Sequence, residues 1–336
     1  MAGVTVTVSG GVTDTLFGKY QAPIKTLVEQ TAGVAEAESD AKKLFNMMDG
    51  GKDYKLAFGG ITALREFEPR GEKEPHAVDG FQETPPKDVG YVEWGKKLEI
   101  SRLLIKFGRF TDLRNRTKAF TNSYYVGRDE FATRLYGEAT QGHSSFKKGK
   151  FTFDITTADK RPLFDTAHPS VVKPSRTQSN AFSNSFSAAD LGLVASAAQK
   201  FEGDTENRLG IKMDTIIIPN DANLINSVFE VVGSYQKPTD SSNAFNWQFG
   251  RWNVMVLPNL DKYIASGAQP WILLDSKYLV SANAAVWGDW EGLRVRSEYD
   301  PETQANIWYG DAMYNAGFVD WRFVACGGIP GATTLS

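Results

Sequence analysis

The sequence has 336 residues, of which 41% are hydrophobic and 23% charged, and its formal net charge is −3. This length is enough for about two domains with substantial cores. The composition excludes a strongly basic nucleic-acid-binding protein and an intrinsically disordered chain. A single cysteine, Cys326, excludes an internal disulfide framework and any zinc module built on paired cysteines; its apolar neighbours predict a small core residue.

The N-terminal segment lacks a basic region followed by an apolar run, and no part of the chain approaches the roughly 20 apolar residues of a membrane span. We therefore expect neither an export signal nor a membrane anchor. Alternating Val and Thr in residues 1–20 are typical of an edge strand, and we interpret this segment as an arm. Residues 23–48 have apolar side chains at broken helical spacing around Gly33, which predicts one or two short helices.

Residues 59–100 have a charged, proline-containing middle between two segments typical of strands, 61–67 and 91–100. This pattern predicts a long two-stranded excursion. An isolated ribbon is at best marginally stable in water, so an ordered one needs a neighbouring surface to lie on. A surface insertion without fixed structure is the alternative, because loops longer than about 12 to 15 residues are usually functional or disordered.

Residues 110–142 have the longest helical pattern in the chain, with apolar residues seven and four positions apart. Asp112 lies in the expected first turn, where the helix dipole favours negative charge, and Gly142 follows the expected end as a C-cap. At 1.5 Å per residue the helix would span about 40 Å or more. Its predicted apolar face consists of Leu113, Phe120, Tyr124, Phe131 and Leu135.

From residue 187 onward, helical and strand patterns alternate, which predicts a mixed α/β domain. Ser187 with Asp190 is typical of a helix start, and Asp221 is suited to cap a second helix. The residues that share one face of the first helix are Leu191, Val194, Ala195, Ala198 and Phe201. The second helix carries the apolar residues Leu224, Ile225, Val228 and Phe229. The predicted strands are 213–218, 252–257 and 271–274.

The last segment alternates apolar residues with arginines over 293–299, turns at 300–303, and continues over 306–324 as further strands with a turn at 314–317. We expect the end of the chain to return to a sheet.

The sequence RPLFDTAHPS at 161–170 places Asp165 and His168 three positions apart, in a chain with only three histidines. This pair could belong to a catalytic or metal site. However, the chain has no phosphate-binding glycine loop, zinc-protease motif or nucleophile elbow, and His76 and His143 lie far from His168 in sequence. The basic residues 147–150 could contact phosphate but are more typical of a solvated turn.

Two tryptophan pairs, Trp247 with Trp252 and Trp287 with Trp290, have spacings found in sugar-binding clefts. Packing or subunit contact is the commoner use of such residues. The less common use leaves one hypothesis open, namely a hydrolase or sugar-binding protein that uses Asp165, His168 and this Trp-rich region.

The order of these features resembles that of tailed-phage major capsid proteins with the Hong Kong 97-type fold, and of the Mu-like major head subunits in particular. The resemblance rests on the charged hairpin that returns through YVEWGKKLEISRLLIKFG (91–108), on the long helix after it, and on PLFDTAHP (162–169). A phrase of the form Pro-Leu-Phe-x-x-x-His-Pro recurs at this place in that family.

The resemblance implies an α+β fold and no enzymatic activity, catalytic residue, cofactor or metal. Its parts would be an N-terminal arm, an extended β-hairpin loop, a peripheral domain with a long spine helix, an axial α/β domain, and terminal strands that return to the peripheral domain. The corresponding ranges are 1–54, 55–105, 106–186, 187–290 and 291–336.

The implied function is self-assembly as hexamers and pentamers into the icosahedral head shell of the virion, around double-stranded DNA that is contacted weakly and without sequence specificity. A separate scaffolding protein, portal and head-completion proteins, and decoration or cement proteins are the implied partners. Residues 1–50 are too short for a large cleaved scaffolding segment, so we expect no cleavage. A bacterial nanocompartment shell of the same fold, enclosing a cargo protein, is the alternative.

Two sets of residues are candidates for this function. In the turn, Phe164 would pack inward together with Leu163, Pro169 would restrict His168 to extended backbone, and His168 would hydrogen-bond locally, with Asp165 as the nearest candidate. The candidate assembly contacts are Arg65, Glu68, Arg70, Glu72, Lys73, Glu74 and Trp94.

Overall fold

The computed structural model describes residues 5–8, 15–59, 85–101, 103, 106–107, 110–205, 207–235, 245–300, 302–303 and 305–336. The chain divides into two compact units, which are described separately. Unit 1 consists of Met1–Leu56, Val89–Ala132 and Trp287–Ala316, and unit 2 of Ala57–Asp88, Thr133–Val286 and Gly317–Ser336.

Unit 1 is built on a five-stranded sheet in the order β1-β13-β14-β5, with β2 also paired to β13. The strands are β1 (Thr5–Val8), β2 (Asn46–Asp49), β5 (Glu93–Ser101), β13 (Ala285–Asp300) and β14 (Ala305–Phe318). β1 pairs in parallel with β13, whereas β14 and β5 are antiparallel, with Trp308 opposite Leu98. The strand predicted in the N-terminal segment and the one predicted near 91–100 are both confirmed.

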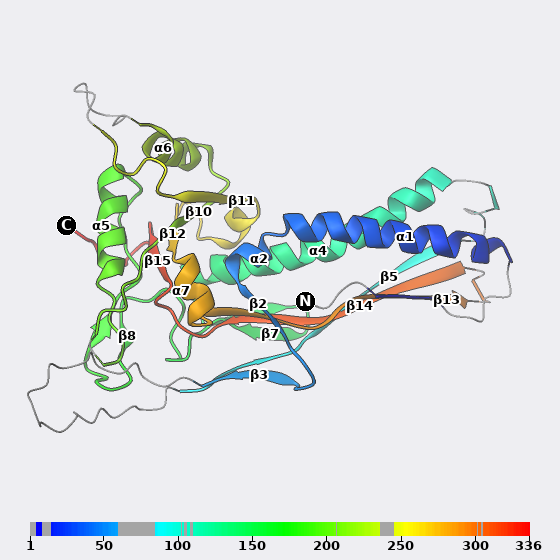
Figure 1. Cartoon of the computed structure of the whole chain (residues 1–336), viewed down its shortest axis with the longest axis horizontal. Helices are drawn as coiled ribbons and strands as arrows, with labels where there is room; N and C mark the ends of the chain where they lie inside the picture. Colours follow the sequence, from blue (N-terminus) through cyan, green and yellow to red (C-terminus); the bar gives the residue numbers. More distant parts are fainter. Residues whose placement is uncertain are drawn as a thin grey trace, which may run out of the picture. The chain divides into compact units, whose positions relative to one another are not determined.

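Two long helices, α1 (Thr15–Glu38) and α4 (Phe110–Thr140), lie side by side in unit 1 (Figure 1). The two helices and the sheet share one hydrophobic core. Apolar side chains from α1, α4, β5, β13 and β14 are buried against each other in it. The core residues are Val28, Ile100, Leu113, Phe120, Leu293, Val295 and Trp308.

The expectation that Gly33 interrupts a helix is wrong, because α1 continues through it to Glu38. A single glycine costs a helix only about 1 kcal/mol, which packing of residues such as Val28 and Ala32 offsets. A short helix α2 (Ala41–Leu44) follows, but Met47 and Met48 belong to strand β2 and not to a helix.

The long helix predicted over 110–142 is confirmed as α4. Its C-terminus has the expected geometry, because Gly142 has a φ of 73° and its N–H donates to the carbonyl of Ala139 at 2.9 Å. Of the predicted apolar face only Tyr124 is half-buried, while its neighbour Tyr125 is buried.

Unit 2 contains a four-stranded sheet in the order β11-β10-β12-β15, in which β10 and β11 are parallel and the other pairs antiparallel. β10 and β12 are buried at every position, as expected for strands at the centre of an α/β sheet. The strands are β10 (Thr215–Pro219), β11 (Asn253–Leu257), β12 (Trp271–Leu274) and β15 (Val324–Gly327).

The helices of unit 2 begin where the sequence predicts. α5 (Ala188–Gln199) is capped by Ser187, whose hydroxyl accepts from the N–H of Asp190 at 3.1 Å. α6 (Ala222–Gly233) is capped by Asp221, which accepts from two N–H groups at its first turn. Two shorter helical segments follow, η1 (Leu260–Tyr263) and α7 (Ser276–Ser281).

One expectation about these segments is wrong: the turn expected at 314–317 is absent, since β14 runs without interruption to Phe318. In α6, Phe229 is 49% exposed, whereas Val228, Val231 and Val232 are buried. The end of the chain returns to a sheet as expected, because β14 pairs with β5 and β15 pairs with β12.

Three two-stranded ribbons complete the described structure: β3 (Lys55–Phe58) with β4 (Lys87–Gly90), β6 (Ser145–Lys148) with β7 (Phe151–Asp154), and β8 (His168–Pro169) with β9 (Thr177–Gln178). Of the basic residues 147–150, predicted as a turn, Gly149 and Lys150 form the turn between β6 and β7, whereas Lys147 and Lys148 belong to β6. The strand predicted at 61–67 lies outside the described residues. No described helix has the length and apolar character needed to cross a membrane.

Candidate functional site: the His168 turn and two arginine clusters

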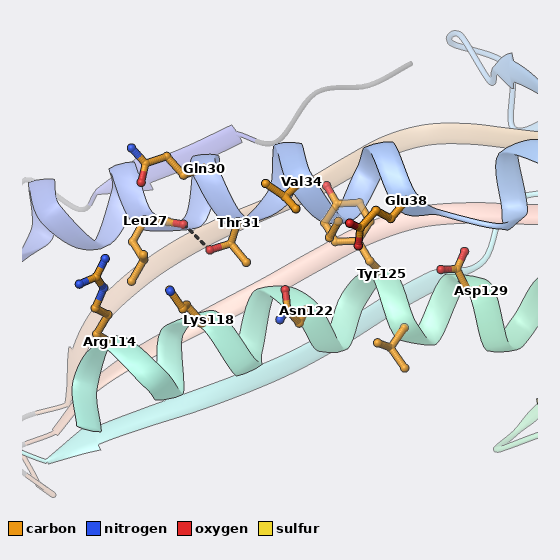
Figure 2. Close-up of a pocket in the computed structure, with 12 residues that line it drawn as sticks. Leu27, Gln30, Thr31, Val34, Glu38, Arg114, Lys118, Asn122, Tyr125 and Asp129 are labelled. Atoms are coloured by element: carbon orange, nitrogen blue, oxygen red, sulfur yellow. Dashed lines mark hydrogen bonds between the residues drawn. The ribbon is translucent and has the colours of Figure 1, made fainter. Parts of the chain in front are cut away.

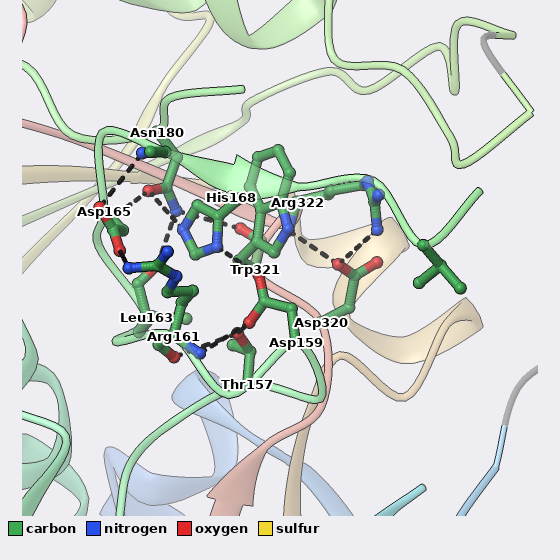
Figure 3. Close-up of polar contacts among 12 residues, drawn as sticks. Thr157, Asp159, Arg161, Leu163, Asp165, His168, Asn180, Asp320, Trp321 and Arg322 are labelled. Atoms are coloured by element: carbon green, nitrogen blue, oxygen red, sulfur yellow. Dashed lines mark hydrogen bonds and ion pairs between the residues drawn. The ribbon is translucent and has the colours of Figure 1, made fainter. Parts of the chain in front are cut away.

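His168 lies in the interior of unit 2, with 1% of its surface exposed. Its Nδ1 is 2.7 Å from Oδ2 of Asp159, and its Nε2 is 3.2 Å from Oδ1 of Asn180. The imidazole ring stacks on the indole of Trp321, with 4.4 Å between centroids and 10° between planes. Figure 3 shows this arrangement, in which both nitrogens and one ring face are engaged by the chain itself.

The amide of Asn180 has a defined orientation. Its Nδ2 donates to the carbonyl of Leu163 at 2.8 Å, and its Oδ1 accepts from the N–H of Asp165 at 3.1 Å. The amide oxygen is therefore the atom that faces His168, and it can only accept a hydrogen bond. An ionised Asp159 carboxylate also only accepts. A doubly protonated imidazole would donate to both partners, whereas a neutral ring can donate to one.

The expected hydrogen bond between His168 and Asp165 is not formed, and that prediction is wrong. Asp165 accepts instead from the N–H of Ala167 at 3.1 Å and lies 3.8 Å from a guanidinium nitrogen of Arg161. An aspartate that bonds to the backbone two residues later stabilises a turn locally. The carboxylate beside His168 comes from Asp159, nine positions away, because the chain folds back through the turn.

Asp159 is held by several donors. Besides His168, the hydroxyl of Thr157 donates to it at 2.5 Å and the N–H of Arg161 at 3.0 Å. Burial raises the pKa of the Asp159 carboxyl, but the hydrogen bonds and the charge of His168 outweigh burial, so that the pKa is lowered from its ordinary value. Asp159 thus remains ionised at neutral pH.

The apolar residues Leu163 and Phe164 of the 161–170 turn are packed inward, whereas Arg161 and Thr166 are exposed. Leu163 and Phe164 are 0% and 4% exposed, and Pro169 pairs with Thr177 in the β8–β9 ribbon. The carbonyl of Asn180 accepts from the N–H of Cys326 at 2.8 Å, which connects the turn to β15. These contacts are those of a structural turn.

This geometry does not suit a catalytic or metal-binding histidine. A general base or a ligand needs a free nitrogen that a substrate or ion can reach, and both nitrogens of His168 have partners inside the protein. Within the described part of the chain, no group of three or more His, Cys, Asp or Glu side chains is arranged to hold a metal ion.

The tryptophan pairs do not present paired rings to a ligand. Trp252 and Trp287 are 7% and 0% exposed, so that each pair has one buried member. Trp247 is exposed, and the guanidinium of Arg251 lies 5.1 Å from its ring. Sugar recognition by two stacked rings is therefore not supported.

Arg322 forms the centre of a second, half-buried polar cluster in unit 2. Its guanidinium lies 3.1 Å from Asp320 and 3.2 Å from Asp204, and the Tyr278 hydroxyl donates to Asp320 at 2.7 Å. Burial lowers the pKa of Arg322, but the two carboxylates outweigh it and raise the pKa. The guanidinium also lies 4.9 Å from the ring of Trp321, which stacks on His168.

Arg128 forms the equivalent centre in unit 1. Its guanidinium lies 2.9 Å from Asp289 and donates to the hydroxyl of Tyr124 at 3.1 Å. The rings of Trp287 and Tyr314 lie 4.9 and 5.4 Å away, so the cation is enclosed by aromatic faces. Burial lowers the pKa of Arg128, but Tyr124 and Asp289 outweigh it and raise the pKa.

Trp94, a predicted assembly residue, belongs to the aromatic cluster of unit 1. Its ring stacks on Tyr314 at 4.8 Å, and its Nε1 donates to the carbonyl of Tyr314 at 3.0 Å. These contacts are within the subunit, and an assembly role for Trp94 stays a prediction. The other predicted assembly residues, Arg65, Glu68, Arg70, Glu72, Lys73 and Glu74, lie outside the described residues.

Sequence reasoning missed Asp159, Arg128 and Arg322, because each of them has a partner that lies nine or more positions away in the sequence and is close only in the folded chain. A weak signal was present: Asp289 lies between two tryptophans, and Arg322 lies between Trp321 and a phenylalanine. A charge among large apolar residues is rarely buried without a partner.

Solved structures share this architecture. The capsid of Ralstonia phage GP4 has a TM-score of 0.52 and 12% identity, with 84% of this chain and 86% of that chain covered. The capsid of cyanophage P-SCSP1u has a TM-score of 0.50 and 8% identity, covering 86% and 88%. The procapsid of bacteriophage JBD30 has a TM-score of 0.50 and 12% identity, covering 94% and 75%. No curated protein matches the chain.

These similarities define the class of the fold, which is the α+β fold of Hong Kong 97-type phage capsid proteins. The sequence pattern of a family described as phage capsid protein matches residues 92–327. The chain therefore belongs to the phage capsid protein family: it is a phage major capsid protein, a structural component of the head shell of the virion and not an enzyme.

Proposed function

We propose that this chain assembles as hexamers and pentamers into an icosahedral shell around double-stranded phage DNA. The family match over residues 92–327 is the observation that carries the proposal. The net charge of −3 is consistent with a shell that encloses DNA without binding it tightly. The sequence PLFDTAHP supports a finer assignment to the Mu-like major head subunits.

The domain roles are part of the proposal. Residues 1–54 would be the N-terminal arm, 55–105 the extended loop, 106–186 the peripheral domain, 187–290 the axial domain, and 291–336 the terminal strands. The loop would lie on a neighbouring subunit, because a long ribbon gains stability only against another surface. The arm instead pairs within its own chain, through β1 and β2 with β13. Arg65, Glu68, Arg70, Glu72, Lys73 and Glu74 would then contact a neighbour through their charges.

The proposed partners are a separate scaffolding protein, portal and head-completion proteins, and decoration or cement proteins. We propose that the subunit is not cleaved during assembly. Its intact mass, measured from purified shells, should equal that of the full chain. A mass well below that value would contradict the proposal.

Negative-stain microscopy of the full chain, expressed with and without the phage's scaffolding protein, tests the central proposal. We expect closed shells, or separate hexamers and pentamers. Nuclease-protected DNA inside shells from infected cells would support a phage head, whereas a uniform protein cargo would indicate a nanocompartment. A subunit that remains monomeric in every preparation would contradict the assembly proposal.

A further inference from the structure

A groove with a volume of about 580 Å³ runs along unit 1 between α1 and α4. Figure 2 shows the two helices side by side, with the residues of both that line the groove. Every residue that lines it belongs to one of these two helices. The groove is therefore a surface between two helices and not part of the His168 turn.

The two ends of the groove carry opposite charges. Arg114 and Lys118, one turn apart on α4, lie at one end, and Glu38, the last residue of α1, lies at the other near Asp129 (Figure 2). Asp129 already accepts from the hydroxyl of Ser39 at 2.6 Å. No ion pair of Arg114, Lys118 or Glu38 with another described residue is formed, so these three charges are available to a partner.

The middle of the groove mixes apolar and uncharged polar side chains. Val34 on α1 is 64% exposed and Val126 on α4 is 59% exposed, and Thr31, Asn122 and Tyr125 also line the groove. Exposed apolar side chains beside unpaired charges are typical of a contact surface. The charges along the groove thus run from cationic to anionic, with an uncharged middle.

We propose that this groove is a twofold contact between two copies of the chain. A line of charges that runs from positive to negative is complementary to itself when one copy is reversed, which is the arrangement that a twofold axis produces. Lys118 of each copy would face Glu38 of the other, and the valines would pack near the axis. The two helix pairs would then pack much as in a four-helix bundle.

A second copy suits the groove better than a ligand of one charge sign. A nucleic acid attracted to Arg114 and Lys118 would meet the carboxylate of Glu38 farther along. The proposal rests on the proposed function only in assuming that copies of the chain associate.

Charge reversal distinguishes this contact from one within a single chain. Lys118 and Asp129 are about 16 Å apart along α4, at 1.5 Å per residue. Glu38 lies at the Asp129 end of the groove, so Lys118 and Glu38 of one copy are too far apart to form an ion pair (Figure 2). Any energetic coupling between them must therefore pass through a partner.

The first test uses Lys118→Glu, Glu38→Lys and the double variant of the full chain, with sedimentation of unassembled subunits as the measurement. Each single variant should weaken dimerisation by roughly threefold to tenfold, because two symmetric, exposed ion pairs become repulsive. The double variant should restore wild-type dimerisation. Single variants without effect, or a double variant as weak as the singles, would overturn the proposal.

The second test uses Val126→Cys, with Val280→Cys as the matched control. Val280 is 55% exposed, close to the exposure of Val126, but it does not line the groove. The native Cys326 is fully buried and does not compete for oxidation. Mild oxidation should convert Val126→Cys to covalent dimers, both before assembly and in shells, at a much higher yield than the control.

Equal yields from the two cysteine variants would overturn the groove contact, as would a disulfide formed only with a different protein. Failure of this proposal is distinguishable from failure of the proposed function. Shells that form normally while Val126→Cys gives no dimers would reject the groove alone. A wild-type chain that forms no shells or capsomers would reject the proposed function.

Discussion

At the scale of single residues, His168, Arg128 and Arg322 share one arrangement: each faces at least one carboxylate and lies against an aromatic ring. His168 and Arg128 are buried, and Arg322 is half-buried. Transferring a charge from water to the interior costs several kcal/mol, and partners recover that cost only if the geometry is good. Removing one partner leaves the other buried and unpaired. These residues therefore stabilise the folded subunit through their ion pairs, hydrogen bonds and ring contacts, and they do not form a reactive site at the surface.

His168→Ala should lower the free energy of unfolding by about 3 to 5 kcal/mol, because it leaves the Asp159 carboxylate without its buried counterpart. Asp165→Ala is the control: Asp165 lies in the same turn, accepts from the N–H of Ala167 and lies near the exposed Arg161, so its loss should cost about 1 kcal/mol. Urea unfolding of the unassembled subunit measures both. If both variants lose the same free energy of unfolding, the contact between His168 and Asp159 contributes no more than an ordinary turn hydrogen bond.

The stability of the subunit should also depend on pH through Asp159. Because its pKa is lowered in the folded state, the carboxylate stabilises the fold above its ordinary pKa of about 3.9, and this contribution is lost as the pH falls below that value. Asp159→Asn should flatten this acid-side decline. Asp165→Asn removes a carboxylate that does not contact His168. With this variant, stability should fall more steeply with decreasing pH than with Asp159→Asn. Identical slopes in urea titrations between about pH 5 and 3 would contradict this assignment.

At the scale of secondary-structure elements, α4 contains two glycines in different surroundings. A Cβ at Gly137 would lie 2.5 Å from Cβ of Tyr263 and 3.0 Å from its carbonyl oxygen, whereas a Cβ at Gly127 would meet nothing within 4 Å. The close approach of η1 to α4 therefore requires a glycine at position 137. At Gly127 the glycine only lowers helix propensity.

Gly127→Ala should stabilise the subunit by about 0.5 to 1 kcal/mol, because alanine loses less backbone entropy in a helix. Gly137→Ala should destabilise it by about 1 to 3 kcal/mol, because Tyr263 must move. Thermal or urea unfolding of the two variants provides a matched comparison within one helix. Stabilisation by both substitutions would show that α4 and η1 can separate at little cost.

At the scale of the whole molecule, the sole cysteine reports on opening of the fold. Cys326 lies opposite Ile272 in the β12–β15 pair, and burial raises the pKa of its thiol. We expect the native subunit to be inert to a thiol reagent and to react at the rate of unfolding when urea is added. Val280→Cys, with an exposed thiol, should react at once. Rapid labelling of native wild-type protein would contradict a closed sheet around β15.

The sequence by itself determined the features that depend on neighbours along the chain. The apolar spacing defined α4, and Ser187 and Asp221 marked the starts of α5 and α6, because capping and periodicity act within one or two turns. The order of these elements, together with PLFDTAHP, was enough for the resemblance to phage capsid proteins.

Only the tertiary structure decided which distant residues meet. Local reasoning paired His168 with Asp165, whereas the fold pairs it with Asp159 and Asn180. The fold also places Arg128 beside Asp289, and strand β14 continues through the turn expected at 314–317. The physical reason is that a buried charge can be satisfied by any partner that packing brings within about 3 Å, and sequence spacing carries no record of that distance.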